Sequence, residues 1–275
     1  YLSDVNQVHY RVVDGSGEIT TDLPIVLNSK PMIHDCAITN NYVLIFDLPV
    51  TFNTSRRNKD ENASDYPVVW DDNYSSKLGL LNRNTNEIKW IEVPNCFLFH
   101  VVNSYEDSSG KVILDFCRYD KLFDFNNPLP FGKKPFLTRW EIDTIKETCV
   151  EKLLDDRPME FARIHPDLEG KEYRFSYILN DGALNNLFKY DFLKDRNEVH
   201  HLGEHKKGAE PVFIPKIDQT SEDSGYVVGF VYDQEVDKSE FIIIDAENFS
   251  EEPLARIQLP SRVPFGFHGS WINLD

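Results

Sequence analysis

Short runs in which apolar and polar residues alternate follow one another along most of the chain, with turn residues between them. Residues 5–13 and 18–26 alternate in this way around a turn of Asp, Gly and Ser at 14–17, which predicts a β-hairpin. Two more hairpins are predicted over residues 77–93 and 97–119. No long stretch has the periodicity of an amphipathic helix, so the pattern predicts an all-β chain.

The pattern continues to the last quarter of the chain. Further strands are predicted at residues 42–50, 136–143, 148–154, 173–179, 187–191, 212–214, 226–233 and 240–245. Frequent antiparallel hairpins fit a sandwich, a barrel or a propeller. A strand, a turn that begins near an Asp and a second strand recur at 11–18, 140–149 and 191–199, which favours propeller blades, although no fixed repeat is evident.

Two segments rich in polar residues and proline, 53–73 and 123–134, are predicted to be loops. Apolar side chains in and beside the second loop would line a tunnel or pack in the core: Leu122, Phe123, Phe125, Leu129 and Phe131. A chain of 275 residues with 41% hydrophobic residues can bury a sizeable core, and we expect residues 1–275 to form a single domain.

Composition narrows the range of partners. The chain has 29 basic and 46 acidic residues and a net charge of −17, which opposes binding to nucleic acid or anionic lipid head groups and is also an ordinary aid to solubility. The substrate is then expected to be neutral or apolar. The cysteines, at positions 36, 96, 117 and 149, include no C-x-x-C pair and fit free thiols in the cytoplasm. Cys36 and Cys96 stand in strand-like runs and are expected to be small buried residues. No apolar run is long enough to span a bilayer.

Three histidines lie in or beside apolar, β-prone runs: His34, His100 and His268. A single histidine in such a place is more often a hydrogen-bonded core residue than a metal ligand. Three imidazoles on separate strands would meet at one point only if the strands were arranged radially. Such a cluster, without thiolates, suits iron, copper, nickel or zinc.

The residues around these histidines resemble motifs of a known family. His-Asp-Cys-Ala-Ile-Thr at 34–39, Phe-His-Val-Val-Asn-Ser-Tyr-Glu at 99–106 and Gly-Phe-His-Gly-Ser-Trp at 266–271 are similar, in this order, to ligand motifs of the carotenoid cleavage oxygenases. Glu-Phe-Ala-Arg-Ile at 160–164 and Glu-Pro-Val-Phe-Ile-Pro at 210–215 resemble two further motifs of that family. Five ordered motifs over nearly the whole chain are far more specific than any one of them.

The resemblance implies a seven-bladed β-propeller, of which this chain would cover the later blades. It also implies a non-haem iron(II) dioxygenase that uses O2 to cut a conjugated C=C bond of a carotenoid or apocarotenoid into two carbonyl products. By the same resemblance, His34, His100 and His268 would hold Fe2+, with Glu160 orienting His100 and Glu210 orienting His268. Because an apolar polyene dissolves in lipid, peripheral contact with a membrane is compatible with this function.

The chain departs from the family pattern in one respect. The family holds its iron with four histidines, the first of them upstream of the segment that matches His34. His9 is the only histidine before His34, and its surroundings resemble the strand just before the second ligand motif. We therefore expect a C-terminal portion of a longer protein, without the first ligand motif. An open propeller exposes unpaired strand edges, so this portion alone is expected to be poorly stable.

Several alternatives remain open from the sequence. The same fold could cleave a stilbene-type phenolic alkene, act as a retinyl ester isomerase, or serve as a non-catalytic binding scaffold. His-Leu-Gly-Glu-His at 201–205 matches an inverted zinc-peptidase pattern, but Gly203 in its middle and the absence of an apolar stripe favour a polar loop. Trp271 is expected to pack against the last ligand segment. No Walker loop, dinucleotide fingerprint or G-x-S-x-G motif is present.

Overall fold

The computed structural model describes residues 6–52, 66–125, 134–264, 267–273. Almost every regular element in these ranges is a β-strand; the one helical turn there is η1 (Pro166–Leu168). The all-β prediction is therefore confirmed. No helix in the described ranges has the length and apolar character needed to cross a bilayer.

The first third of the chain forms three small antiparallel sheets. Their strands are β1 (Gln7–Val13) with β2 (Ile19–Val26), then β3 (Ala37–Ile38), β4 (Tyr42–Asp47), β7 (Lys77–Asn82) and β8 (Ile88–Glu92) in that order, and β5 (Val50–Phe52) with β6 (Val68–Trp70). The hairpins at 5–26 and 77–93 are thus formed as predicted. The predicted strand 42–50 divides in two, since Pro49 lacks an N–H to continue the ladder.

The central sheet has seven strands, from β15 to β9 in reverse chain order. They are β9 (Phe97–Glu106), β10 (Val112–Tyr119), β11 (Pro135–Asp143), β12 (Thr148–Arg163), β13 (Phe175–Asn180), β14 (Asn186–Asp191) and β15 (Arg196–His201). The long strand β12 pairs with β11 along its first part and with β13 along its last part. It therefore joins two four-stranded units, β9 to β12 and β12 to β15.

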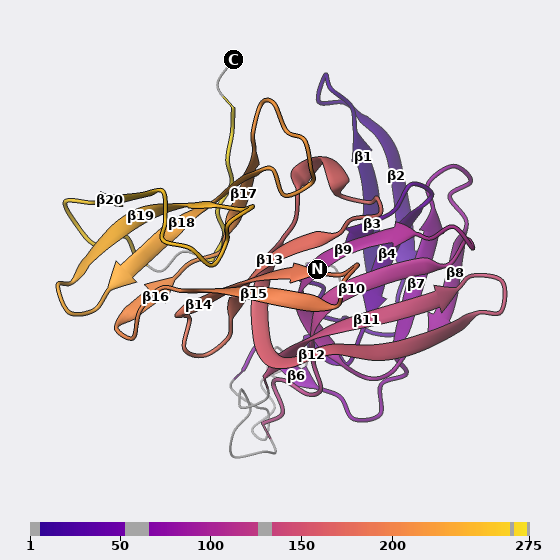
Figure 1. The fold of residues 1–275 in the computed structure, drawn as a ribbon. Coiled ribbons are helices and arrows are strands. Elements are labelled where there is room, and N and C mark those ends of the chain that lie inside the picture. Colours follow the sequence, from indigo (N-terminus) through magenta and orange to yellow (C-terminus); the bar gives the residue numbers. More distant parts are fainter. Residues whose placement is uncertain (1–5, 53–65, 126–133, 265–266, 274–275) are drawn as a thin grey trace.

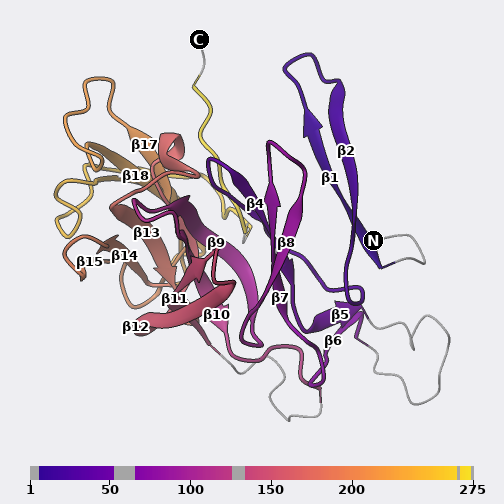
Figure 2. The same cartoon turned by 90° about the vertical axis from the view of Figure 1, so that its right-hand side faces the viewer.

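The last sheet follows the order β16, β18, β19, β20, with β17 also paired to β18. Its strands are β16 (Lys206–Gly208), β17 (Val212–Pro215), β18 (Gly225–Asp233), β19 (Lys238–Asp245) and β20 (Ala255–Gln258). In Figure 1 the central sheet lies between this sheet and the sheet of β3, β4, β7 and β8, called the β3–β8 sheet below. Figure 2 shows the β1–β2 hairpin beside β7 and β8.

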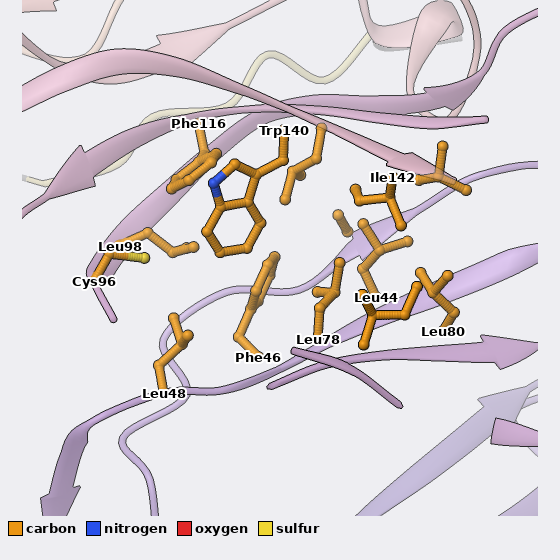
Figure 3. Packing of buried hydrophobic residues seen from close by; sticks show 14 residues of the cluster. Leu44, Phe46, Leu48, Leu78, Leu80, Cys96, Leu98, Phe116, Trp140 and Ile142 are labelled. Atoms are coloured by element: carbon orange, nitrogen blue, oxygen red, sulfur yellow. The ribbon is translucent and has the colours of Figure 1, made fainter. Parts of the chain in front are cut away.

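Apolar residues fill the spaces between neighbouring sheets. Figure 3 shows Phe116 and Trp140 from the central sheet facing Phe46 and Leu78 from the β3–β8 sheet, and all four side chains are buried. A second cluster lies between the two units that share β12, and a third joins β13–β15 to the β16–β20 sheet. Face-to-face packing of successive antiparallel sheets is the arrangement expected of propeller blades.

A candidate metal centre

The three sequence-predicted histidines meet although they come from distant parts of the chain. His34 precedes β3 in a segment without regular structure, His100 lies in β9, and His268 follows β20. One ring nitrogen from each lies within 4.8 Å of the others. The centroid of the His100 ring is 5.2 Å from that of His34 and 4.9 Å from that of His268. The three imidazoles therefore form a compact group of nitrogen donors.

Irregular backbone around His100 helps to direct its ring into this group. The ladder between β9 and β10 shifts register twice, so that Val101 lies opposite Phe116 while Leu98 lies opposite Arg118. Extra residues on one strand bend it and change the direction of its side chains. The bulged part of β9 contains His100.

Glu160 forms a hydrogen bond with the His100 ring. Its Oε2 lies 2.5 Å from Nδ1 of His100 and also accepts the backbone N–H of Phe161 at 2.9 Å. The Glu160 side chain is buried. Burial alone would lower the pKa of His100, but the hydrogen bond and negative charge of Glu160 outweigh it and raise that pKa. With Nδ1 engaged, Nε2 is left as the nitrogen available to a ligand.

Glu210 has the corresponding place beside His268. Its Oε1 lies 3.2 Å from Nδ1 of His268, and its Oε2 accepts the backbone N–H of Gly269 at 2.8 Å. Arg163 approaches the same carboxylate, with its Nε 3.9 Å from Oε1, and donates a hydrogen bond to the Gly269 carbonyl at 3.2 Å. Glu210 is buried, whereas the His268 side chain is 52% exposed. Arg163 and Glu210 together fasten the C-terminal segment that carries His268.

Aromatic side chains enclose the group on two sides. Phe161 lies 4.9 Å from the His100 ring and 5.9 Å from the His268 ring, between centroids. Its φ of 57° is in the left-handed region, which is strained for a phenylalanine and is typical of functional sites. Phe99 packs against the His34 ring in a T-shaped arrangement, with 5.1 Å between the ring centroids.

The free nitrogens fit a metal ion. Nε2 of His100 is buried and has no hydrogen-bond partner among the described residues, which is unfavourable unless something binds there. Burial, followed by the charge of His100, lowers the pKa of His34 and favours its neutral, metal-binding form. A cavity of about 180 Å³ adjoins all three rings and is also lined by Asp35, Ala162 and Glu210. Neutral imidazoles are ligands for iron and other transition metals.

The other histidines lie elsewhere in the structure. His9 contacts Asp22 within the β1–β2 hairpin, and His165 contacts Gln219. His200 contacts the Phe249 carbonyl. His201 ends β15 and His205 precedes β16, so the zinc-peptidase pattern falls on a turn between strands and not on a helix. None of these five belongs to the three-histidine group.

Some residues at this site had no assigned role in the sequence. Asp35 and Arg163 stand in two of the matched motifs, but only the folded chain shows their contacts with the ligand-bearing segments. Cys36 was expected to be a small buried residue beside a ligand. It is exposed, because it lies in the irregular segment before β3 and borders a cavity. Cys96 is buried as expected.

The residues predicted to line an apolar tunnel or pack in the core lie in different surroundings. Leu122 is buried and Phe123 is partly buried in a cluster that also contains Phe97 and Phe99, so these two lie on the side of the site where Phe99 meets His34. Phe125 stacks on Tyr66 at 3.7 Å. Positions 129 and 131 lie outside the described residues.

Comparison with known proteins agrees with this geometry. Residues 2–273 match the model of the family described as RPE65, retinal pigment epithelial membrane protein. The chain belongs to the RPE65/carotenoid cleavage oxygenase family. Its relatives include the carotenoid cleavage oxygenase of Mycobacterium tuberculosis, which is 27% identical over 97% of this chain and 63% of its own length. The carotenoid 9,10(9',10')-cleavage dioxygenase 1 of Phaseolus vulgaris is 30% identical over 97% of this chain and 53% of its own length.

A solved structure extends the comparison to the fold. Cobalt-substituted apocarotenoid oxygenase (ACO) of Synechocystis superposes with a TM-score of 0.88 at 26% identity, covering 98% of this chain and 58% of that one. The propeller prediction is therefore confirmed. The sheets described here form part of such a propeller and do not close into a ring. The chain spans somewhat more than half the length of these relatives.

Proposed function

We propose that the protein is a non-haem iron(II) dioxygenase that cleaves a conjugated C=C bond of a carotenoid or apocarotenoid into two carbonyl products. The convergence of His34, His100 and His268 is the single observation that carries the proposal. Membership of the family and the names of the relatives, which are carotenoid cleavage oxygenases and dioxygenases, support the choice of reaction. Residues 1–275 would act as one domain of that enzyme.

His34, His100 and His268 would hold Fe2+, and the cobalt-substituted relative supports a divalent ion in this fold. When bound, iron supplies open positions and electrons for the reaction of dioxygen with the alkene. Glu160 and Glu210 hold Nδ1 of His100 and His268, which fixes each ring and leaves its Nε2 for the ion. The fourth histidine that the family resemblance implies would come from outside these 275 residues.

The surroundings of the site suit an apolar substrate. Phe97, Phe99, Tyr119 and Phe123 belong to one cluster, and Phe99 also packs against the His34 ring. Phe97 and Tyr119 are buried, whereas Phe99 and Phe123 are only partly buried. A rigid polyene lying against Phe99 and Phe123 would gain from apolar burial and would present one double bond to the metal. The proposed substrates are O2 and a polyene, with no role for nucleic acid. We place the enzyme in the cytoplasm, where peripheral contact with a membrane would supply the polyene.

The test uses the full-length protein and measures bound iron and the visible absorbance of an added apocarotenoid. We expect iron to bind and the absorbance to fade in air but not under argon, with label from isotopic dioxygen appearing in the carbonyl products. His34→Ala should abolish both iron binding and fading. His201→Ala, which changes an exposed histidine bonded to Asn186, should leave both intact and serves as the control.

Two results would contradict the proposal. Iron binding that survives His34→Ala would remove the metal centre from these residues. Cleavage of a stilbene but not of any apocarotenoid would show that the substrate is the stilbene-type phenolic alkene of the alternative hypothesis. No observation in the structure or the comparisons favours that alternative or the non-catalytic scaffold.

A further inference from the structure

The segment that carries His34 lies along the outer edge of the strand that carries His100. Strand β9 is the last strand of the central sheet, and β3, which follows His34, packs against it. The ladder partner of β3 is β4, on its other side. Residues 32–36 have no regular structure. Side chains therefore have to set the position of this segment relative to β9.

Three hydrogen bonds that each use a side chain join the two segments at successive points. They run from the backbone N–H of Val101 to Asp35 Oδ2 at 2.9 Å, from Ser104 Oγ to the Ile38 carbonyl at 2.7 Å, and from Thr39 Oγ1 to Glu106 Oε1 at 2.6 Å. The bond to Asp35 is the nearest of the three to both histidines, since Asp35 follows His34 and Val101 follows His100 in the chain.

Asp35 is well placed to hold both segments. Val101 lies in the part of β9 where the register shifts, and its N–H points to Asp35. A backbone donor at a bulge needs a partner outside the regular ladder. The other carboxylate oxygen of Asp35 accepts the N–H of Cys36 at 2.7 Å, which fixes the side chain against its own backbone. One carboxylate thus bridges the residues that follow the two ligands.

We propose that Asp35 is a positioning residue that sets the place of His34 relative to His100 in the metal centre. This inference rests on the proposed function, because Asp35 would act through the two histidines and would not touch the ion. Loss of the carboxylate frees the irregular segment and the Val101 N–H, so the His34 ring is no longer held at its distance from His100. Residues that orient metal ligands typically change metal affinity about 10- to 100-fold when they are replaced.

The experiment titrates Co2+ into metal-free full-length protein and follows the visible absorption of the bound ion. The variants are Asp35→Ala, Asp35→Asn and His34→Ala. The control is Asp107→Asn, because Asp107 likewise accepts backbone N–H groups, from Ser109 and Lys111, in a turn away from the site. Far-ultraviolet circular dichroism verifies that each variant is folded.

We expect Asp35→Ala to weaken Co2+ binding about 10- to 100-fold and to change the shape of the cobalt spectrum, as a displaced ligand requires. Asp35→Asn keeps one acceptor oxygen and should lose less affinity. Asp107→Asn should bind as the parent protein does. If Asp35→Ala does not fold, Asp35→Asn decides: an unchanged affinity and an unchanged spectrum refute the positioning role.

The possible failures are distinguishable. If the parent binds no Co2+, or if His34→Ala binds it as well as the parent does, the proposed metal centre itself is wrong. If the parent binds Co2+, His34→Ala does not, and a folded Asp35 variant binds with parental affinity and spectrum, only the role of Asp35 is wrong.

Discussion

Replacing Glu160 by glutamine tests the effect of its charge on the proposed metal centre. The carboxylate oxygen Oε2 accepts from both His100 Nδ1 and the Phe161 backbone N–H. A glutamine amide oxygen in the same position can accept from both donors. Glu160→Gln should therefore keep the ring orientation while it removes a buried negative charge beside His100. Its amide Nε2 would take the place of Oε1, which is buried without a hydrogen-bond partner among the described residues, so the variant should also lose some stability.

The expected magnitude follows from the kind of hydrogen bond that is lost. A hydrogen bond to a charged group contributes about 1.5–3 kcal/mol and a neutral one about 0.5–1.5 kcal/mol. The midpoints of these ranges differ by about 1.25 kcal/mol, which corresponds to a roughly eight- to tenfold change in an equilibrium constant. We expect Glu160→Gln to weaken metal binding about tenfold. Glu160→Ala should weaken it more and should also destabilise the fold, because the Phe161 N–H then lacks its acceptor.

The assay is a metal titration of the purified full-length protein by isothermal calorimetry, with thermal unfolding measured in parallel. Glu222→Gln is the matched control, since Glu222 also accepts backbone N–H groups, from Arg174 and Phe175, away from the histidines. Equal metal affinities for Glu160→Gln, Glu222→Gln and the parent would refute the claim that the charge of Glu160 strengthens His100 as a ligand.

Two further predictions concern stability. A Cβ at Gly225 would lie 2.6 Å from the Ile214 carbonyl oxygen and 2.3 Å from the Phe213 ring, so Gly225→Ala should destabilise the protein by about 1–3 kcal/mol in urea unfolding. Gly15→Ala is the control, because a Cβ at Gly15 has no atom within 4 Å and should cause no such loss. Equal urea midpoints for the two variants would contradict this packing. Burial would raise the pKa of Asp191 and Glu240, but hydrogen bonds from basic side chains outweigh it and lower both pKa values. The stability that these two carboxylates contribute is present above their unfolded-state pKa of about 4 and is lost as pH falls through the folded pKa. The thermal midpoint should therefore drop in acid, and a midpoint that stays constant down to about pH 3 would count against these ion pairs.

The sequence was sufficient where structure depends on local residues. The hairpins form where turn residues separate alternating runs, because turn geometry and alternation are both encoded within a few positions. Strand β12 was predicted to end at residue 154 but runs to Arg163. Asp-Asp-Arg-Pro at 155–158 has the composition of a turn, yet the strand continues there and exchanges β11 for β13 as its partner. That exchange is a property of the neighbouring sheets.

Short edge elements were missed for a similar reason. β16 consists of Lys206, Lys207 and Gly208, which have no preference for a strand, and it forms only because β18 offers a free edge beside it. β20, Ala255–Gln258, is mostly exposed and depends in the same way on β19. Propensity predicts the strands that have a buried face and fails where pairing alone decides.

The proposed metal centre lies where both turn residues and strand propensity predict least. His34 and His268 are in segments without regular structure, and His100 is in a strand whose register is broken. Their motifs identify the residues, but spacing along the chain does not determine that the rings meet. Links between distant segments do so: Glu160 to His100, Glu210 to Gly269 and Asp35 to Val101. A regular ladder would hold these segments with backbone bonds alone. Because the ligand-bearing backbone departs from the ladder, acidic side chains have to satisfy its N–H groups, which explains why the matched motifs contain acidic residues beside or opposite each histidine.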